Sequence, residues 1–167
     1  MTGVQTCALP IFLTFLEKNS RIDLQELAVI LGTDEATVAN EIAKMEQEHI
    51  ICGYHTLIDW DKTSADKVTA LIEVRVTPQR GQGFDSIAER IYNYPEVRSV
   101  YLISGAYDLM VILEGKTLKE VSGFVSDKLS TLDSVLSTAT HFILKKYKDH
   151  GTIFERKTRD ERMPVTL

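Results

Sequence analysis

Cysteine is scarce in this sequence of 167 residues, which argues against cysteine-based architectures. The two cysteines, Cys7 and Cys52, form no C-x-x-C pair and no framework of the kind that stabilises small secreted domains. The four histidines are scattered without the spacing of metal ligands; they are His49, His55, His141 and His150. The sequence therefore predicts a protein of the reducing cytoplasm that has no metal site and no cofactor.

Long apolar runs are also missing. The longest apolar stretches, such as residues 70–72 and 109–113, are far shorter than the roughly 20 residues of a membrane span. Residues 1–10 (MTGVQTCALP) lack the basic segment with which a secretion signal begins. Because VQTCALPI resembles the translation of a sequencing adapter, we expect 1–10 to be a non-native segment. We expect no membrane association.

A helical hydrophobic period governs the first part of the chain. Between Ile11 and Glu48 the apolar residues recur at helical spacing, and turn signals at 19–21 and 32–34 divide the segment into three helices. Asp34 is the expected N-cap of the third helix. The short joint at Gly32 is typical of a helix-turn-helix. We therefore assign residues 11–60 to a winged helix-turn-helix domain.

Beyond Ile50 the period shortens toward two, which predicts strands. A short strand over Thr56–Trp60 is expected to lead into a linker at 61–66. The regulatory domain, 67–150, should then contain strands at 68–76, 97–104, 109–114 and 135–144, a loop at 77–83, and helices at 84–94 and 118–132. This βαββαβ order predicts an α+β fold of the ferredoxin-like type, in which two helices cover one face of a four-stranded antiparallel sheet.

The second sheet face also carries apolar residues. On the first strand we assign Leu71 and Val74 to one face, and Ala70 and Ile72 to the other. Two helices cannot cover both faces, so we expect a second subunit to pack on the open one and form a homodimer. The C-terminal tail, 151–167, alternates charge and is either disordered or an arm that clasps another subunit.

Short motifs follow one another along the chain in a characteristic order. In the first half they are Asn19-Ser20-Arg21-Ile22, Gln25-Glu26-Leu27-Ala28, Leu31-Gly32, Thr37-Val38 and Ile50-Ile51-Cys52-Gly53-Tyr54. In the second half they are Val97–Tyr101, Ser104-Gly105-Ala106-Tyr107-Asp108, and the last strand with Thr138, Thr140 and Lys145. From about Phe12 to Glu155, this pattern resembles the Lrp/AsnC (leucine-responsive/asparagine-operon) family of transcription regulators.

The resemblance implies a DNA-binding head joined to a regulatory domain that forms dimers and then tetramers or octamers. It also implies that an amino acid or related small metabolite binds where regulatory domains meet. By position, the effector candidates are Gly105, Tyr107 and Asp108, with Ser104 and Thr138 as further ones. A carboxylate can pair with the ammonium of an amino acid, while turn amides receive its carboxylate.

Simpler explanations of these residues stay open. An ordinary hairpin turn also uses such a sequence, with Gly105 supplying a positive φ and Asp108 bonding its own backbone. Thr138 has a high β-propensity whatever its function. Small ferredoxin-like dimers also include enzymes, so the fold alone does not exclude catalysis. The regulatory domain, however, contains no nucleophile or metal-ligand grouping in its sequence, and we therefore predict that the protein is not an enzyme.

The third helix is the expected reader of the DNA major groove. The DNA-binding candidates are Arg21, Glu35, Thr37, Asn40, Glu41 and Lys44. Between Phe12 and Trp60 there are three basic and nine acidic residues, which gives this segment a net charge of −6. Phosphate neutralisation supplies most non-specific affinity, so one head should bind DNA weakly. Two functions follow: a DNA-binding regulator that senses an effector, or an effector sensor with a degenerate head that acts through a partner protein.

Overall fold

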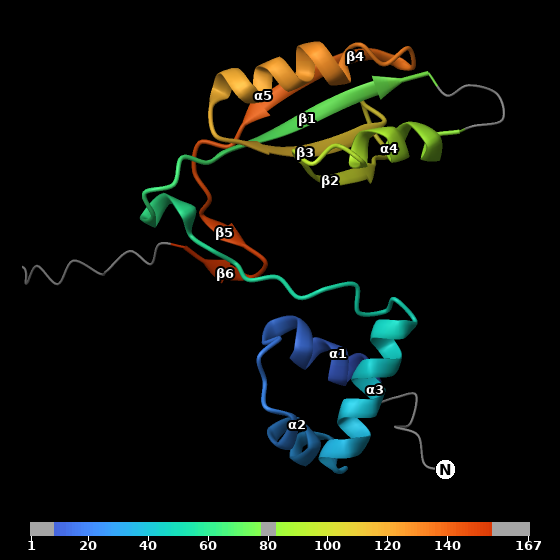
Figure 1. The fold of residues 1–167 in the computed structure, drawn as a ribbon, viewed down its shortest axis with the longest axis vertical. Helices are drawn as coiled ribbons and strands as arrows, with labels where there is room; N and C mark the ends of the chain where they lie inside the picture. Colours follow the sequence, from blue (N-terminus) through green and yellow to red (C-terminus); the bar gives the residue numbers. More distant parts are fainter. Residues whose placement is uncertain (1–8, 78–82, 155–167) are drawn as a thin grey trace, which may run out of the picture. The chain divides into compact units, whose positions relative to one another are not determined.

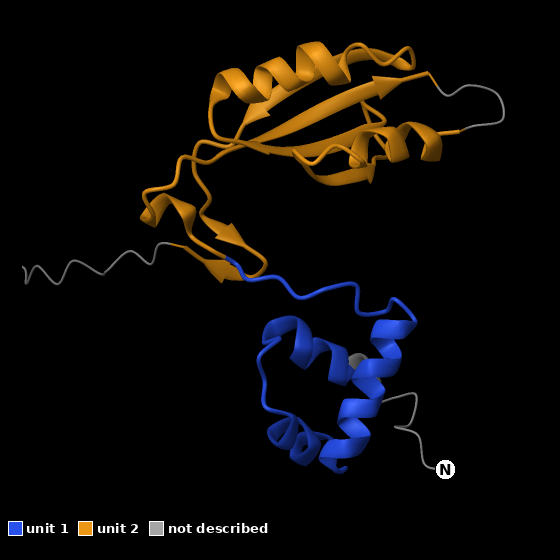
Figure 2. Cartoon of the chain, in the orientation of Figure 1, with its two compact units in different colours: residues 1–57 blue, residues 58–167 orange. Residues whose placement is uncertain are grey.

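The structure is a computed structural model that describes residues 9–77 and 83–154. The chain divides into two compact units, residues 1–57 and residues 58–167 (Figure 2). Each unit has its own hydrophobic core. The segment 1–10, expected to be non-native, lies outside the described residues except for Leu9 and Pro10, which begin the first helix.

Three helices form the first unit, as the helical period predicts (Figure 1). They are α1 (Leu9–Lys18), α2 (Leu24–Leu31) and α3 (Glu35–Gln47). The buried residues that hold them together are Phe12, Leu16, Leu27, Ala28, Val38 and Met45. Gly32 ends α2 in the left-handed conformation, with φ of +67°, which a residue without a Cβ adopts at no steric cost. The short joint between α2 and α3 is confirmed.

The prediction of a strand over Thr56–Trp60 is wrong. Residues 52–59 form no regular element, and a 3₁₀ turn, η1, spans Trp60–Lys62. Within the described part of the chain, no backbone hydrogen bond involves residues 53–58. An extended segment is a strand only when a neighbour supplies the ladder of hydrogen bonds, so apolar alternation alone did not make one here. The described first unit therefore contains no strand of the expected wing.

The second unit confirms the βαββαβ order (Figure 1). Its elements are β1 (Val68–Val76), α4 (Asp85–Tyr92), β2 (Val97–Leu102), β3 (Leu109–Gly115), α5 (Leu118–Phe124), η2 (Val125–Leu129) and β4 (Val135–Phe142). The strands form an antiparallel sheet in the order β2-β3-β1-β4. The last helix is shorter than expected, because it changes from α to π geometry at Val125. Most of the loop predicted at 77–83 lies outside the described residues.

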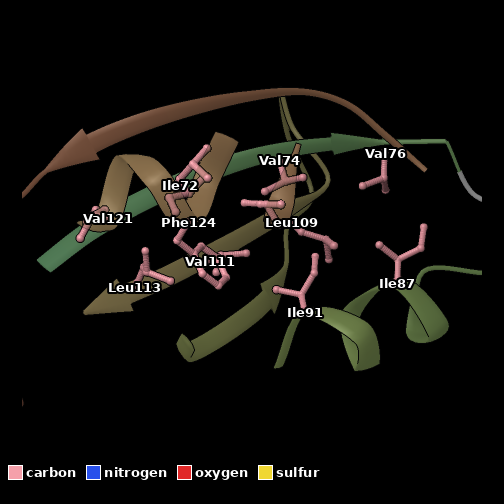
Figure 3. Packing of buried hydrophobic residues seen from close by; sticks show 13 residues of the cluster. Ile72, Val74, Val76, Ile87, Ile91, Leu109, Val111, Leu113, Val121 and Phe124 are labelled. Atoms are coloured by element: carbon pink, nitrogen blue, oxygen red, sulfur yellow. The ribbon is translucent and has the colours of Figure 1, made fainter. Parts of the chain in front are cut away.

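One face of the sheet is buried under the helices. From the strands, the core contains Ala70, Ile72, Val74, Val76, Leu109, Val111 and Leu113. Apolar residues of α4, α5 and η2 pack against them, and Figure 3 shows Ile87 and Ile91 of α4 on the same side as Val121 and Phe124 of α5. The assignment of Val74 to the face of Leu71 was wrong. Side chains alternate along a strand, so Val74 shares the buried face with Ala70 and Ile72.

A small hairpin follows the sheet and was not predicted. Strand β5 (Lys148–Asp149) pairs with β6 (Thr152–Ile153). The two loop residues, His150 and Gly151, both have positive φ, at 43° and 78°. This combination is typical of the tight primed turns that match strand twist. The boundary expected after His150 therefore falls inside a turn.

Candidate DNA-binding helix and effector site

The start of α3 is fixed by a capping network. The Asp34 carboxylate accepts the Thr37 backbone N–H at 2.9 Å and the Thr37 hydroxyl at 2.6 Å. These bonds hold the pKa of the Asp34 carboxyl below its usual value. The predicted N-cap is confirmed. Because the Thr37 hydroxyl is hydrogen-bonded to Asp34, the role of Thr37 that the structure supports is to fix the start of the helix.

The predicted DNA-binding residues differ in their exposure. Glu35, Asn40 and Lys44 are exposed, whereas Thr37 and Glu41 are partly buried at the flank of the helix. Three further exposed residues on the outer side of α3 were missed: Ala36, Ala43 and Gln47. The sequence feature that could have identified them is their position on the side of the helix opposite Val38 and Met45. A selection of polar residues alone does not use this position.

Arg21 lies outside the helices of the head, in the turn between α1 and α2. The backbone N–H of Arg21 donates to the Asn19 side chain at 3.1 Å, and Arg21 is exposed. Lys44 on α3 lies 4.0 Å from Glu48, a distance at which an exposed pair contributes little. Both cations therefore remain available for phosphate contacts.

The effector candidates gather in the turn between β2 and β3. Asp108 is its anchor, because the carboxylate Oδ2 accepts the Val76 N–H at 2.9 Å. Its own backbone N–H donates to the Val74 carbonyl at 3.1 Å, and its carbonyl accepts the Ile103 N–H at 2.8 Å. Asp108 thus ties the turn to the end of β1, where the pairing with β4 has a register shift. The hairpin explanation, in which Asp108 bonds only its own turn, does not describe this geometry.

Gly105 is exposed and is not held in a glycine-only conformation. The positive-φ glycines of the described residues are Gly32, Gly83 and Gly151. A Cβ built on Gly105 would meet only the Ile103 side chain, at 3.8 Å, an ordinary contact. The alternative explanation as an ordinary hairpin turn, in which Gly105 supplies a positive φ, does not describe this backbone. Nothing within the described chain requires glycine at this position.

The remaining candidates lie close to the same end of β1. Tyr107 is partly buried and Ser104 is exposed in the turn. Thr138 of β4 is in register with Val74, and its hydroxyl lies 3.4 Å from that of Ser130. Strand β1 therefore lies between Asp108, in the turn directly before β3, and Thr138 of β4. Sequence reasoning missed Ser130, which ends η2 and comes near Thr138 because the chain turns back from η2 into β4.

Within residues 9–77 and 83–154, no group of His, Cys, Asp or Glu side chains is arranged to hold a metal ion. None of the helices in these ranges combines the length and the apolar character needed to cross a membrane.

Comparison with known proteins identifies the family. Residues 69–153 match the Lrp/AsnC ligand binding domain. Over 155 residues the chain is 52% identical to the uncharacterized HTH-type transcriptional regulator YugG of Bacillus subtilis (strain 168), covering 92% of this chain and 93% of that protein. This chain belongs to the Lrp/AsnC family. It is thus a helix-turn-helix transcription regulator with a ligand-binding domain, and not an enzyme.

Two solved structures of transcription regulators have the same fold. A Neisseria meningitidis transcriptional regulator in complex with L-Met aligns with a TM-score of 0.66 and 22% identity, covering 83% of this chain and 88% of that one. The feast or famine regulatory protein of M. tuberculosis complexed with L-methionine aligns with a TM-score of 0.69 and 19% identity, covering 86% and 95%. At these identities the likeness establishes the fold alone.

Proposed function

We propose that this Lrp/AsnC protein binds specific DNA sites through α3 and senses an amino acid or related small metabolite through its regulatory domain. The observation that carries the proposal is the presence, in one chain, of a capped third helix with an exposed polar side and a ligand-binding domain whose β2–β3 turn is open to an external group. Selection of genomic fragments by the purified full-length protein tests the DNA-binding part. Recovery of a common sequence is expected, whereas recovery of random fragments contradicts it.

An amino acid fits the chemistry of the β2–β3 turn. Only Oδ2 of Asp108 is engaged within the described residues, so Oδ1 can accept the ammonium of an effector. Exposed backbone amides around Gly105 can donate hydrogen bonds to the carboxylate of the effector. Methionine complexes of two structural relatives support this class of ligand. We therefore place the effector against Ser104, Gly105, Tyr107 and Asp108, with Thr138 on the other side of β1.

Asp108→Asn is expected to weaken effector binding by roughly 10- to 150-fold, which corresponds to the loss of one charged hydrogen bond of about 1.5 to 3 kcal/mol. The amide keeps an oxygen that can accept the Val76 N–H, so the turn should stay in place while the charge is lost. Calorimetric titration with amino acids, L-methionine included, measures the effect. An unchanged melting temperature is the control for folding. Wild-type affinity in Asp108→Asn would remove Asp108 from the site.

The open face of the sheet supports a homodimer. Leu71 of β1 and Ile112 of β3 are in register at its centre, with Met110 beside them, and all three are partly buried in the single chain. Helices cover only the opposite face, so these apolar side chains gain most by packing against a second copy. His141 and Glu73 meet on the same face, with 3.3 Å between Nε2 and Oε1. We propose this face as the dimer contact, with tetramers or octamers built from such dimers.

Glu41→Lys is expected to strengthen non-specific DNA binding, because it removes a repulsive charge from the flank of α3 and adds an attractive one. The plot of log affinity against log salt should become steeper by about one. Filter binding to random duplex DNA at several salt concentrations measures both effects. Glu89→Lys makes the same change at an exposed position on α4 of the regulatory domain. This control should leave the slope unchanged. Equal slopes for Glu41→Lys and wild type would place Glu41 away from the DNA.

A further inference from the structure

The exposed side of α3 carries an uncharged stripe with one lysine. Its residues are Ala36, Asn40, Ala43, Lys44 and Gln47, all exposed. The last four stand at relative positions 0, 3, 4 and 7, the spacing with which the third helix of homeodomains contacts bases in the major groove. The acidic residues Glu35, Glu41 and Glu46 lie to the sides of the stripe. These three carboxylates of α3 therefore flank the stripe and do not lie within it.

The two amides on this stripe have no structural task. Neither Asn40 nor Gln47 makes a side-chain hydrogen bond within residues 9–77 and 83–154, whereas Asp23, Asp34 and Asn19 in the same unit all cap or bridge backbone groups. An exposed carboxamide offers a donor and an acceptor side by side, the pair that matches N7 and N6 of adenine.

We propose that this stripe recognises A·T base pairs, with Asn40 and Gln47 each binding one adenine and the methyl groups of Ala36 and Ala43 packing on thymine methyls. The proposal rests on the DNA-binding function proposed above and specifies its sequence class. Seven residues of helix rise about 10.5 Å, close to three base-pair steps of about 3.4 Å. The two adenines should therefore lie about three base pairs apart within one half-site.

The same stripe is poorly suited to G·C pairs. Guanine is usually contacted by a bidentate arginine or by lysine, and the stripe offers only Lys44. Cytosine is contacted by an acidic side chain, and Glu41 is partly buried at the flank. Lys44 is left to contact a phosphate or a single guanine between the two adenines. The chemistry of the stripe thus favours sites rich in A·T.

Binding-site selection with the full-length protein and randomised DNA tests the proposal. Adenines should be enriched at two positions about three base pairs apart. Asn40→Ala should reduce the preference for adenine over guanine at one position by roughly 5- to 150-fold and leave the other intact, and Gln47→Ala should do the converse. Gln25→Ala removes an exposed glutamine amide from α2 and should leave the preferred sequence unchanged.

The possible failures are distinguishable. If the wild type selects a defined site with G·C pairs at both positions, or if both alanine variants keep the wild-type preference for adenine, the A·T assignment is overturned while DNA binding stands. If the wild type selects no sequence at all, the DNA-binding function itself is overturned, and this assignment with it. Circular dichroism of each variant confirms that α3 is still folded.

Discussion

Ile112→Lys is expected to convert the protein from a dimer or larger assembly into monomers. Ile112 lies on the open face of the sheet, in register with Leu71 on one side and Ser99 on the other. In a symmetric contact each substitution appears twice, so two lysines would be buried without partners. A buried unpaired charge costs several kcal/mol, enough to dissociate a contact of ordinary size. Light scattering at micromolar concentration measures the change in mass.

The fold of the single chain should survive this substitution. The Ile112 side chain lies on the face opposite the core of Ile72, Val111 and Leu129, so its loss opens no cavity there. Glu89→Lys introduces the same side chain on α4 and should keep the wild-type mass. A wild-type protein that is already monomeric, or an Ile112→Lys variant that keeps the wild-type mass, would contradict the proposed dimer contact.

The isolated head, residues 1–61, is expected to bind an operator roughly 10²- to 10⁴-fold more weakly than the full-length assembly. The sequence from Phe12 to Trp60 has a net charge of −6, so each head should release few counterions and bind weakly alone. Joining several heads raises the effective concentration of the second contact without any new interaction. Gel shifts with the selected site at physiological salt measure the difference.

The monomeric full-length variant provides the control for this second prediction. If avidity is the cause, Ile112→Lys should lose nearly the same factor as the isolated head, even though its α3 and linker are intact. A thermal melt of residues 1–61 shows whether the core around Leu27 and Met45 forms without the rest of the chain. Tight operator binding by a folded isolated head would refute the avidity argument.

Much of the fold was predictable because local and global preferences agree. The change from a helical to a two-residue period located both domains, and Asp34 and Gly32 fixed the joint between α2 and α3. The strand expected over Thr56–Trp60 failed because a strand depends on a neighbour, which periodicity does not supply. The β5–β6 hairpin was missed because its strands have only two residues each, too few for a period to be detected.

The candidate sites were only partly accessible to sequence reasoning. The Gly-x-Tyr-Asp turn supplied the effector candidates, which stay a prediction, but no local pattern reveals that Asp108 reaches the Val76 amide 32 residues away. Gly105 looked like a turn glycine, although its backbone does not need one. On α3, charge drew notice to Glu41 and Lys44, whereas burial determines which residues face outward. Gln47 became a candidate only once the buried side of the helix was known.

Effector binding in the regulatory domain is expected to change operator binding by the head, and one linkage measurement tests this coupling directly. The affinity of the full-length protein for its selected site should be measured across a series of concentrations of the amino acid that binds it. A shift of about 5- to 150-fold is expected, with the same factor when effector affinity is measured with and without DNA. An amino acid that binds tightly yet leaves operator affinity unchanged at saturation would contradict the account.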